Sequence, residues 1–142
     1  MAFSAPTTID WRTEDFVHIA RRQQADEDAA ARRGGRLLIC DTDALATSVW
    51  HERYLGAGSP DVARLAATRS YALYILTGDD IPFVQDGTRD GEHVRAWMTG
   101  RFRQALQART QEWIEVAGGR GERLAAATAR IDALLAQPIG AR

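Results

Sequence analysis

The stretch Leu37-Leu38-Ile39-Cys40-Asp41-Thr42-Asp43 decides how this 142-residue sequence is interpreted. Its apolar half has no polar alternation, which predicts a strand over residues 36–40 that is buried on both faces. Two carboxylates follow at once, and a helical pattern begins directly after them. In an open parallel sheet, ligands bind outside the carboxyl ends of the strands. Asp41 and Asp43 are therefore candidates for a Mg²⁺ and phosphate site.

The same residues fit a plainer interpretation, in which Asp43 caps the following helix and Asp41 is a solvated strand end. Caps directly after strands are common, so spacing alone leaves both interpretations open. Cys40, on the predicted strand, is expected to be an inert thiol in the core.

Two more apolar segments, residues 71–76 and 113–116, are predicted as strands. Helices are predicted at about 13–33, from Asp43 to Gly56, from Ser59 onward, at about 92–109 and after the glycine loop 118–121. This alternation predicts an α/β fold, with a parallel sheet flanked by helices on both faces. A single domain is expected over residues 1–142, with 1–10 as an irregular lead-in.

Composition excludes several classes of function. The net charge is −1 and basic residues are spread along the chain, so no electrostatic footprint for nucleic acid is expected. No signal peptide is visible, and no apolar run approaches the roughly 20 residues that span a bilayer. One cysteine fits a reducing compartment, which predicts a cytoplasmic protein without a membrane partner. All 18 basic residues are arginine, so the sequence contains no lysine.

A loop over residues 77–91 is dense in turn residues and carboxylates. Asp86-Gly87 demands a turn, and Arg89 lies just beyond it. The planar guanidinium of arginine suits phosphate oxygens, so Arg89 could reach over the phosphates of a nucleotide. The alternative is a surface loop in which Arg89 makes a weak ion pair with a neighbouring aspartate.

Trp50 and Tyr54 lie one turn apart on the helix that follows the carboxylates. They could stack on a flat ligand ring, although core packing on the face of Ala46 and Val49 is the favoured interpretation. The last helix is expected to carry an apolar face. The histidines have no metal-ligand spacing and are expected to be surface or helix residues: His18, His51 and His93. The glycine-rich turn at 118–121 resembles a phosphate loop only weakly.

Several segments together are similar to the ribosylnicotinamide kinase domain of NadR-type proteins, also described as a NadR-like AAA-family ATPase. The resemblance covers residues 11–137, and the pairing of D-T-D with D-G-x-R at this separation is its most specific part. The segments that carry it are Leu38-Ile39-Cys40-Asp41-Thr42-Asp43-Ala44-Leu45-Ala46-Thr47-Ser48-Val49-Trp50, Tyr54-Leu55-Gly56, Tyr74-Ile75-Leu76-Thr77 and Asp80-Ile81-Pro82-Phe83-Val84-Gln85-Asp86-Gly87-Thr88-Arg89-Asp90.

The resemblance implies a P-loop kinase fold that transfers the γ-phosphate of ATP to nicotinamide riboside with Mg²⁺, a step of NAD biosynthesis. By the same resemblance, Asp41 and Asp43 serve the Mg²⁺ ion and the substrate hydroxyl. Asp86 to Arg89 belong to the lid that closes on ATP, and Arg95 assists from the next helix. Trp50 and Tyr54 fall where the riboside ring could stack.

The sequence departs from the family at its front, where a strand, a Walker A loop and its helix are expected. None of these precedes the D-T-D strand, and no lysine is present to serve a Walker A loop. The 142-residue chain is therefore expected not to phosphorylate at a useful rate. The alternative function is a non-catalytic module that binds a nucleoside, a nucleotide or a protein partner.

The missing first strand would lie between the strands that end at Asp41 and Leu76. Without it, those strands must pair directly or expose backbone edges and apolar side chains. We therefore expect marginal stability, self-association through an incomplete sheet, or an arrangement that differs from that of the family.

Overall fold

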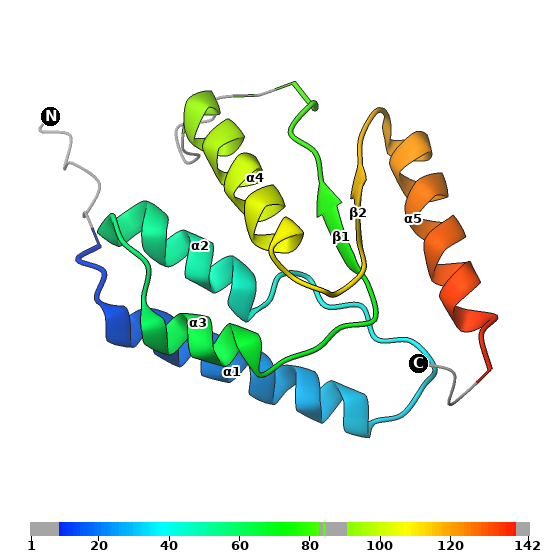
Figure 1. The fold of residues 1–142 in the computed structure, drawn as a ribbon, viewed down its shortest axis with the longest axis horizontal. Coiled ribbons are helices and arrows are strands. Elements are labelled where there is room, and N and C mark those ends of the chain that lie inside the picture. Colours follow the sequence, from blue (N-terminus) through cyan, green and yellow to red (C-terminus); the bar gives the residue numbers. More distant parts are fainter. Residues whose placement is uncertain (1–8, 83, 85–90, 139–142) are drawn as a thin grey trace, which may run out of the picture. The chain divides into compact units, whose positions relative to one another are not determined.

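The computed structural model describes residues 9–82, 84 and 91–138. The elements follow the order α1–α2–α3–β1–α4–β2–α5 (Figure 1). They form two compact units, which are described separately: unit 1 comprises Met1–Thr68 and unit 2 comprises Arg69–Arg142. In the described part, unit 1 is helical and unit 2 holds a two-stranded parallel sheet with two helices.

Unit 1 consists of α1 (Thr13–Arg32), α2 (Ala44–Leu55) and α3 (Pro60–Ala67), and each helix packs against the other two. Local signals set the helix ends. Ser59 accepts a hydrogen bond from the Val62 amide at 3.3 Å and Pro60 opens α3, as predicted. Gly56 ends α2 with a φ of 78°, a left-handed conformation that favours glycine. The buried apolar side chains of the unit are Phe16, Ala20, Ala44, Leu45, Ala46, Val49, Val62 and Ala66.

The start of α1 is stabilised by an acidic residue of its own first turn. Arg12 is the residue before the helix, and its backbone N–H donates to the carboxylate of Asp15 at 2.9 Å. Asp15 N–H donates in return to the Arg12 carbonyl at 3.0 Å. The Asp15 carboxylate thus accepts a hydrogen bond at the helix start from within the first turn, where the helix macrodipole also favours negative charge.

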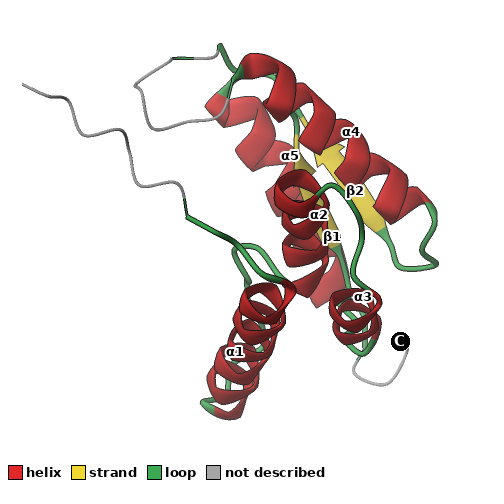
Figure 2. Ribbon diagram, turned by 90° about the vertical axis from the view of Figure 1, so that its left-hand side faces the viewer, coloured by secondary structure: helices red, strands yellow, loops and turns green. Residues whose placement is uncertain are grey.

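The predicted strand at residues 36–40 is wrong. No strand forms among the described residues of unit 1, and the segment between α1 and α2 is irregular (Figures 1 and 2). Leu37, Leu38 and Ile39 are 49%, 45% and 71% exposed, and Cys40 is half-buried rather than a core thiol. A strand needs a neighbour to complete its hydrogen bonds, and helical unit 1 offers none.

In unit 2, β1 (Tyr74–Thr77) and β2 (Trp113–Val116) pair in parallel, with Tyr74 opposite Trp113 and Thr77 opposite Val116. The prediction for residues 113–116 is confirmed, whereas the strand expected at 71–76 begins at Tyr74. That strand is half-exposed rather than buried on both faces. A two-stranded sheet with one helix on each strand leaves much of its surface uncovered.

Two helices flank this sheet: α4 (Glu92–Gln107) packs on β1, and α5 (Arg120–Leu135) packs on β2 (Figure 2). The apolar face expected on the last helix is not buried, since none of the side chains of α5, all of them described, lies in the core. Among the residues that the structure describes, no helix has both the length and the apolar character needed to cross a membrane.

Candidate functional site

The D-T-D turn, Asp41-Thr42-Asp43, connects the irregular segment to α2. Asp43 caps the helix: its Oδ1 accepts a hydrogen bond from the Ala46 amide at 3.0 Å. Its backbone carbonyl accepts from both the amide and the hydroxyl of Thr47, at 3.1 and 3.2 Å. Thr42 has a φ of 66°, the only left-handed non-glycine residue in the described part of the chain. Asp41 is exposed, so the turn presents one solvated carboxylate beside one capping carboxylate.

A glutamine on α1 reaches this turn from the side. Gln23 Nε2 donates to the Thr42 carbonyl at 3.5 Å and to Glu27 Oε1 at 3.3 Å. Glu27 lies one helical turn further along α1 and is only 6% exposed. Sequence reasoning gave neither residue a role at this turn, because nothing close to Gln23 in the sequence indicates that it reaches Thr42.

The aromatic pair on α2 is stacked. The rings of Trp50 and Tyr54 have centroids 5.7 Å apart and planes 16° apart. Trp50 and Tyr54 are 37% and 43% exposed, so the core placement favoured for both is wrong; Ala46 and Val49 are buried instead. Tyr54 also contacts Trp11, with ring centroids 5.8 Å apart. Both rings of the stack are therefore exposed to solvent, and Tyr54 also packs on Trp11.

His51, expected at the surface or on a helix, is on α2 and is 4% exposed. Its Nδ1 lies 2.7 Å from the Ala57 carbonyl and its Nε2 lies 3.0 Å from Thr13 Oγ1. Because a carbonyl only accepts, Nδ1 carries the proton, and in the neutral ring Nε2 accepts from the Thr13 hydroxyl. The ring also meets Phe16 edge-on, with centroids 5.1 Å apart. His51 thus joins the start of α1 to the α2–α3 connection.

The carboxylates of the D-T-D turn fit only part of a magnesium site. In the part of the chain that is described, no group of three or more His, Cys, Asp or Glu side chains could hold a metal ion. Mg²⁺ is usually bound by one or two carboxylates and completed by waters and substrate phosphates. Asp41 and Asp43 suit that arrangement, in which the ligand brings the remaining oxygens.

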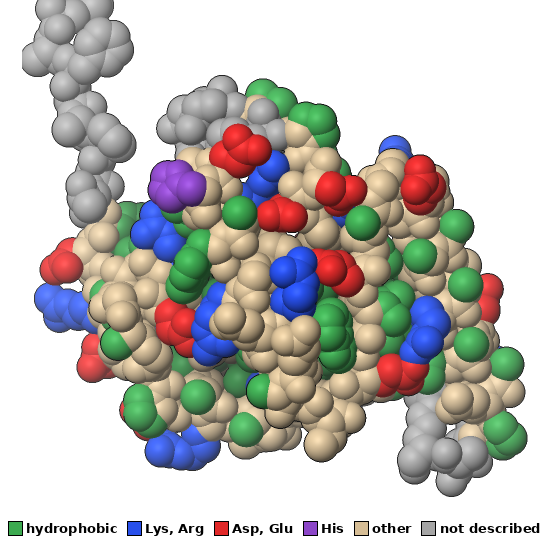
Figure 3. Space-filling model, turned by 45° about the horizontal axis from the view of Figure 1, so that its top comes forward, with side chains coloured by type: hydrophobic (Ala, Val, Ile, Leu, Met, Phe, Trp, Pro, Cys, Tyr) green, Lys and Arg blue, Asp and Glu red, His purple; other side chains and the backbone are tan. Residues whose placement is uncertain are grey.

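On the face drawn in Figure 3, acidic and basic side chains are interspersed, and neither sign gathers into a broad patch. This distribution gives no strong field for steering a polyanion to that face.

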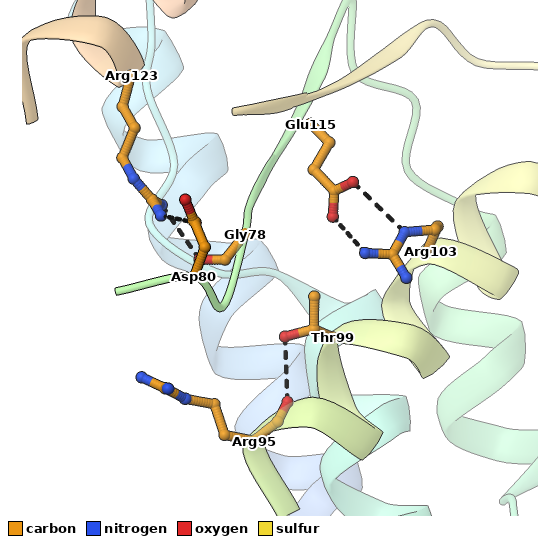
Figure 4. A network of polar contacts seen from close by, with 7 residues as sticks. All are labelled: Gly78, Asp80, Arg95, Thr99, Arg103, Glu115 and Arg123. Atoms are coloured by element: carbon orange, nitrogen blue, oxygen red, sulfur yellow. Dashed lines mark hydrogen bonds and ion pairs between the residues drawn. The ribbon is translucent and has the colours of Figure 1, made fainter. Parts of the chain in front are cut away.

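The remaining predicted residues belong to unit 2. Asp86 and Arg89 lie outside the described residues. Arg95, on the first turn of α4, is half-buried, and its NH2 lies 4.0 Å from Glu92 Oε1. Its backbone carbonyl accepts from Thr99 Oγ1 at 3.1 Å, and its side chain extends away from Thr99 (Figure 4). Arg95 is thus placed at the start of α4.

The carboxyl ends of β1 and β2 are joined by Arg123, from the first turn of α5 (Figure 4). Its side chain is 11% exposed, and it donates to the carbonyls of Gly118 and Gly78 at 2.8 and 3.1 Å. It also pairs with Asp80, whose other oxygen accepts from the Gly118 amide at 2.6 Å. The Gly118 amide, followed by the Arg123 charge, holds the pKa of Asp80 below its ordinary value.

This network decides what the glycine-rich turn at 118–121 can do. The Gly118 amide already donates to Asp80, and the Glu122 side chain occupies the space beside the Gly118 Cα. A phosphate would have to displace two acids of the chain itself. The turn is therefore filled by internal carboxylates and does not serve as a phosphate cradle in this arrangement.

A second ion pair joins α4 to β2. Arg103 of α4 donates to both oxygens of Glu115 on β2, at 2.6 and 3.4 Å. The hydrogen bonds and charge of Glu115 raise the pKa of the Arg103 guanidinium above its ordinary value. This bidentate contact ties α4 to β2.

Comparison with known protein families matches residues 2–123 to the family described as AAA domain. A search of curated proteins and a search of solved structures each found no match. The matched range includes the D-T-D turn, Trp50, Arg95 and Arg123, and it supports a P-loop-like fold with a nucleotide-binding, ATPase-like function. Because this range covers well over half of the sequence, the chain belongs to the AAA domain family.

Proposed function

We propose that this chain binds a nucleoside through unit 1, as the substrate-binding half of a NadR-like, ATP-dependent kinase site. Asp41 and Asp43 would serve Mg²⁺ and the 5′-hydroxyl, and Trp50 would stack on the base. Nicotinamide riboside is the proposed ligand. Asp86, Arg89 and Arg95 are proposed as residues on the ATP side. Bound Mg²⁺ would supply charge stabilisation for the phosphates.

One observation carries the proposal: an exposed aromatic ring and the D-T-D turn share one helix face. Asp43, Trp50 and Tyr54 are seven and then four residues apart, which places them on the same side of an α-helix. Seven residues rise about 10 Å, which is close to the length of a nucleoside. With its ring on Trp50, a riboside would bring its hydroxyl toward Asp43 and Asp41.

We propose further that the 142-residue chain does not transfer phosphate at a useful rate. P-loop enzymes position the β- and γ-phosphates with a Walker A backbone and its lysine. No lysine occurs in the sequence, and the glycine-rich turn of unit 2 is filled by Asp80 and Glu122. Binding without turnover is the expected behaviour.

Isothermal titration calorimetry with nicotinamide riboside in Mg²⁺ buffer tests this proposal. We expect wild-type protein to bind, and Trp50→Ala to weaken binding about tenfold through the loss of one stacking contact. Trp97→Ala is the matched control, because Trp97 is an exposed tryptophan on α4 and lies in the other unit. It should leave the affinity unchanged.

Two results would contradict the proposal. Folded wild-type protein that gives no riboside-binding heat would exclude the binding function, and equal affinity of wild type and Trp50→Ala would exclude the stacking role. Product formation from riboside and Mg·ATP, followed by mass spectrometry, would overturn the proposed lack of turnover.

A second candidate function, an interaction module, is favoured by the exposed apolar run Leu37–Leu38–Ile39. If this run mediates self-association, sedimentation velocity should show a larger species as protein concentration rises. Ile39→Asp should shift the chain toward monomer, because a charge at the most exposed of the three positions opposes apolar contact. Ile9→Asp, at another exposed isoleucine, should not. Wild type that stays monomeric at all concentrations would exclude self-association through this run.

A further inference from the structure

The Thr42 carbonyl accepts a hydrogen bond that links α1 to the D-T-D turn. A carbonyl and the amide that follows it share one rigid plane, so fixing the Thr42 carbonyl also fixes the Asp43 amide. Gln23 Nε2 donates to this carbonyl at 3.5 Å. Thr42 itself is left-handed, with a φ of 66°, which L-residues with a side chain adopt at a cost. The turn therefore needs support from its surroundings.

Glu27 orients the side-chain amide of Gln23. Its Oε1 accepts from the same Gln23 Nε2 at 3.3 Å, and at 6% exposure the carboxylate is largely removed from water. A buried carboxylate requires donors, which makes it a strong acceptor for the Gln23 amide. With one amide hydrogen drawn toward Glu27, the other is directed to the Thr42 carbonyl.

We propose that Gln23, oriented by Glu27, is a positioning residue that sets the direction in which Asp41 and Asp43 leave the D-T-D turn. The inference rests on the proposed function, in which these carboxylates serve Mg²⁺ and the riboside hydroxyl. Its geometric part concerns the turn itself and is tested without any ligand.

Two neighbouring glutamines give a matched pair of variants. Gln23→Met removes the donor to Thr42 and Glu27 at nearly constant length. Gln24→Met removes a donor of the same helix whose partners are the Leu65 carbonyl, at 2.7 Å, and Thr68. Gln24 thus joins α1 to the end of α3.

Hydrogen exchange of the Ala46 amide, measured by NMR, reports whether Asp43 keeps its cap. Gln23→Met should speed this exchange about fivefold, the effect of losing one modest hydrogen bond. Gln24→Met should leave it unchanged while lowering the melting temperature. Gln23→Arg, whose N–H groups can still donate to both acceptors, should restore slow exchange.

A titration with Mn²⁺ alone, followed by electron paramagnetic resonance, is the second readout. Gln23→Met should weaken Mn²⁺ binding, whereas Gln24→Met should not, although it destabilises the fold. Unchanged Ala46 exchange in Gln23→Met would overturn the proposal. Faster exchange in a protein that binds no Mn²⁺ even as wild type would leave the positioning role in place and remove the metal role of the proposed function.

Discussion

Arg123→Met is expected to lower the free energy of unfolding of unit 2 by about 2 to 4 kcal/mol. The guanidinium donates to two backbone carbonyls, Gly78 and Gly118, and pairs with Asp80 while being only 11% exposed. Methionine fills a similar volume but donates nothing. The carbonyls at the ends of both strands and the Asp80 carboxylate would then lose their partner together.

Native-state hydrogen exchange of the Gly78 amide measures this effect, because Gly78 N–H donates to Val116 O across the two strands at 2.9 Å. Arg120→Met is the control: Arg120 opens the same helix and is exposed. It should change exchange little. Equal effects of the two variants would show that charge on α5, and not the Arg123 contacts, stabilises the strand ends.

The same network sets an acid dependence. Since the pKa of Asp80 is lowered in the folded state, its contribution to stability is fully present above the ordinary value of 3.8. That contribution is lost as the pH falls from there through the folded-state pKa. Asp80→Asn cannot ionise and lacks this contribution at every pH. Its free energy of unfolding should therefore approach that of wild type as the pH falls below this value. Acid unfolding of both proteins, followed by circular dichroism, would show the trend.

His51→Ala should produce the second large effect, a loss of about 2 to 4 kcal/mol in the free energy of unfolding of unit 1. The variant leaves the Ala57 carbonyl and the Thr13 hydroxyl without their present partner, and it removes the edge contact with Phe16. Because Thr13 and Phe16 lie in the first turn of α1 and Ala57 lies just after α2, the substitution loosens the start of α1 and the end of α2 together.

His18→Ala is the matched control, since His18 is an exposed histidine on α1. Exchange of the α2 amides should accelerate strongly in His51→Ala and hardly at all in His18→Ala. If the two variants behave alike, His51 is a tolerant position and its hydrogen bonds contribute little to the unit.

Sequence signals that act locally predicted local structure well. The helix ends fall where the sequence predicts them, at Asp43, Gly56 and Ser59. A cap depends only on residues within one helical turn, so local sequence suffices to predict it. The apolar segment at 113–116 formed its strand because residues 74–77 supply a parallel neighbour.

Properties that depend on distant partners were harder to predict. Residues 36–40 have strand composition, but composition cannot supply a second strand. The sequence predicts His51 only as a surface or helix residue, because nothing near it in the sequence indicates that Thr13 and Ala57 would meet its ring nitrogens. Gln23 and Arg123 were missed for the same reason: their partners lie 19 and 43 positions away.

The contacts of His51 with Thr13, Phe16 and Ala57 bear on the role of the connection between α1 and α2. Since α1 is fixed to the rest of unit 1 through side chains at its own first turn, the stretch from Gly34 to Ile39 need not guide the helix into place. Lengthening this stretch would then affect the free energy of folding only through the entropy of loop closure, which costs about 0.6 kcal/mol for each doubling of a flexible loop. This stretch is a natural position for an inserted tag or a permuted terminus.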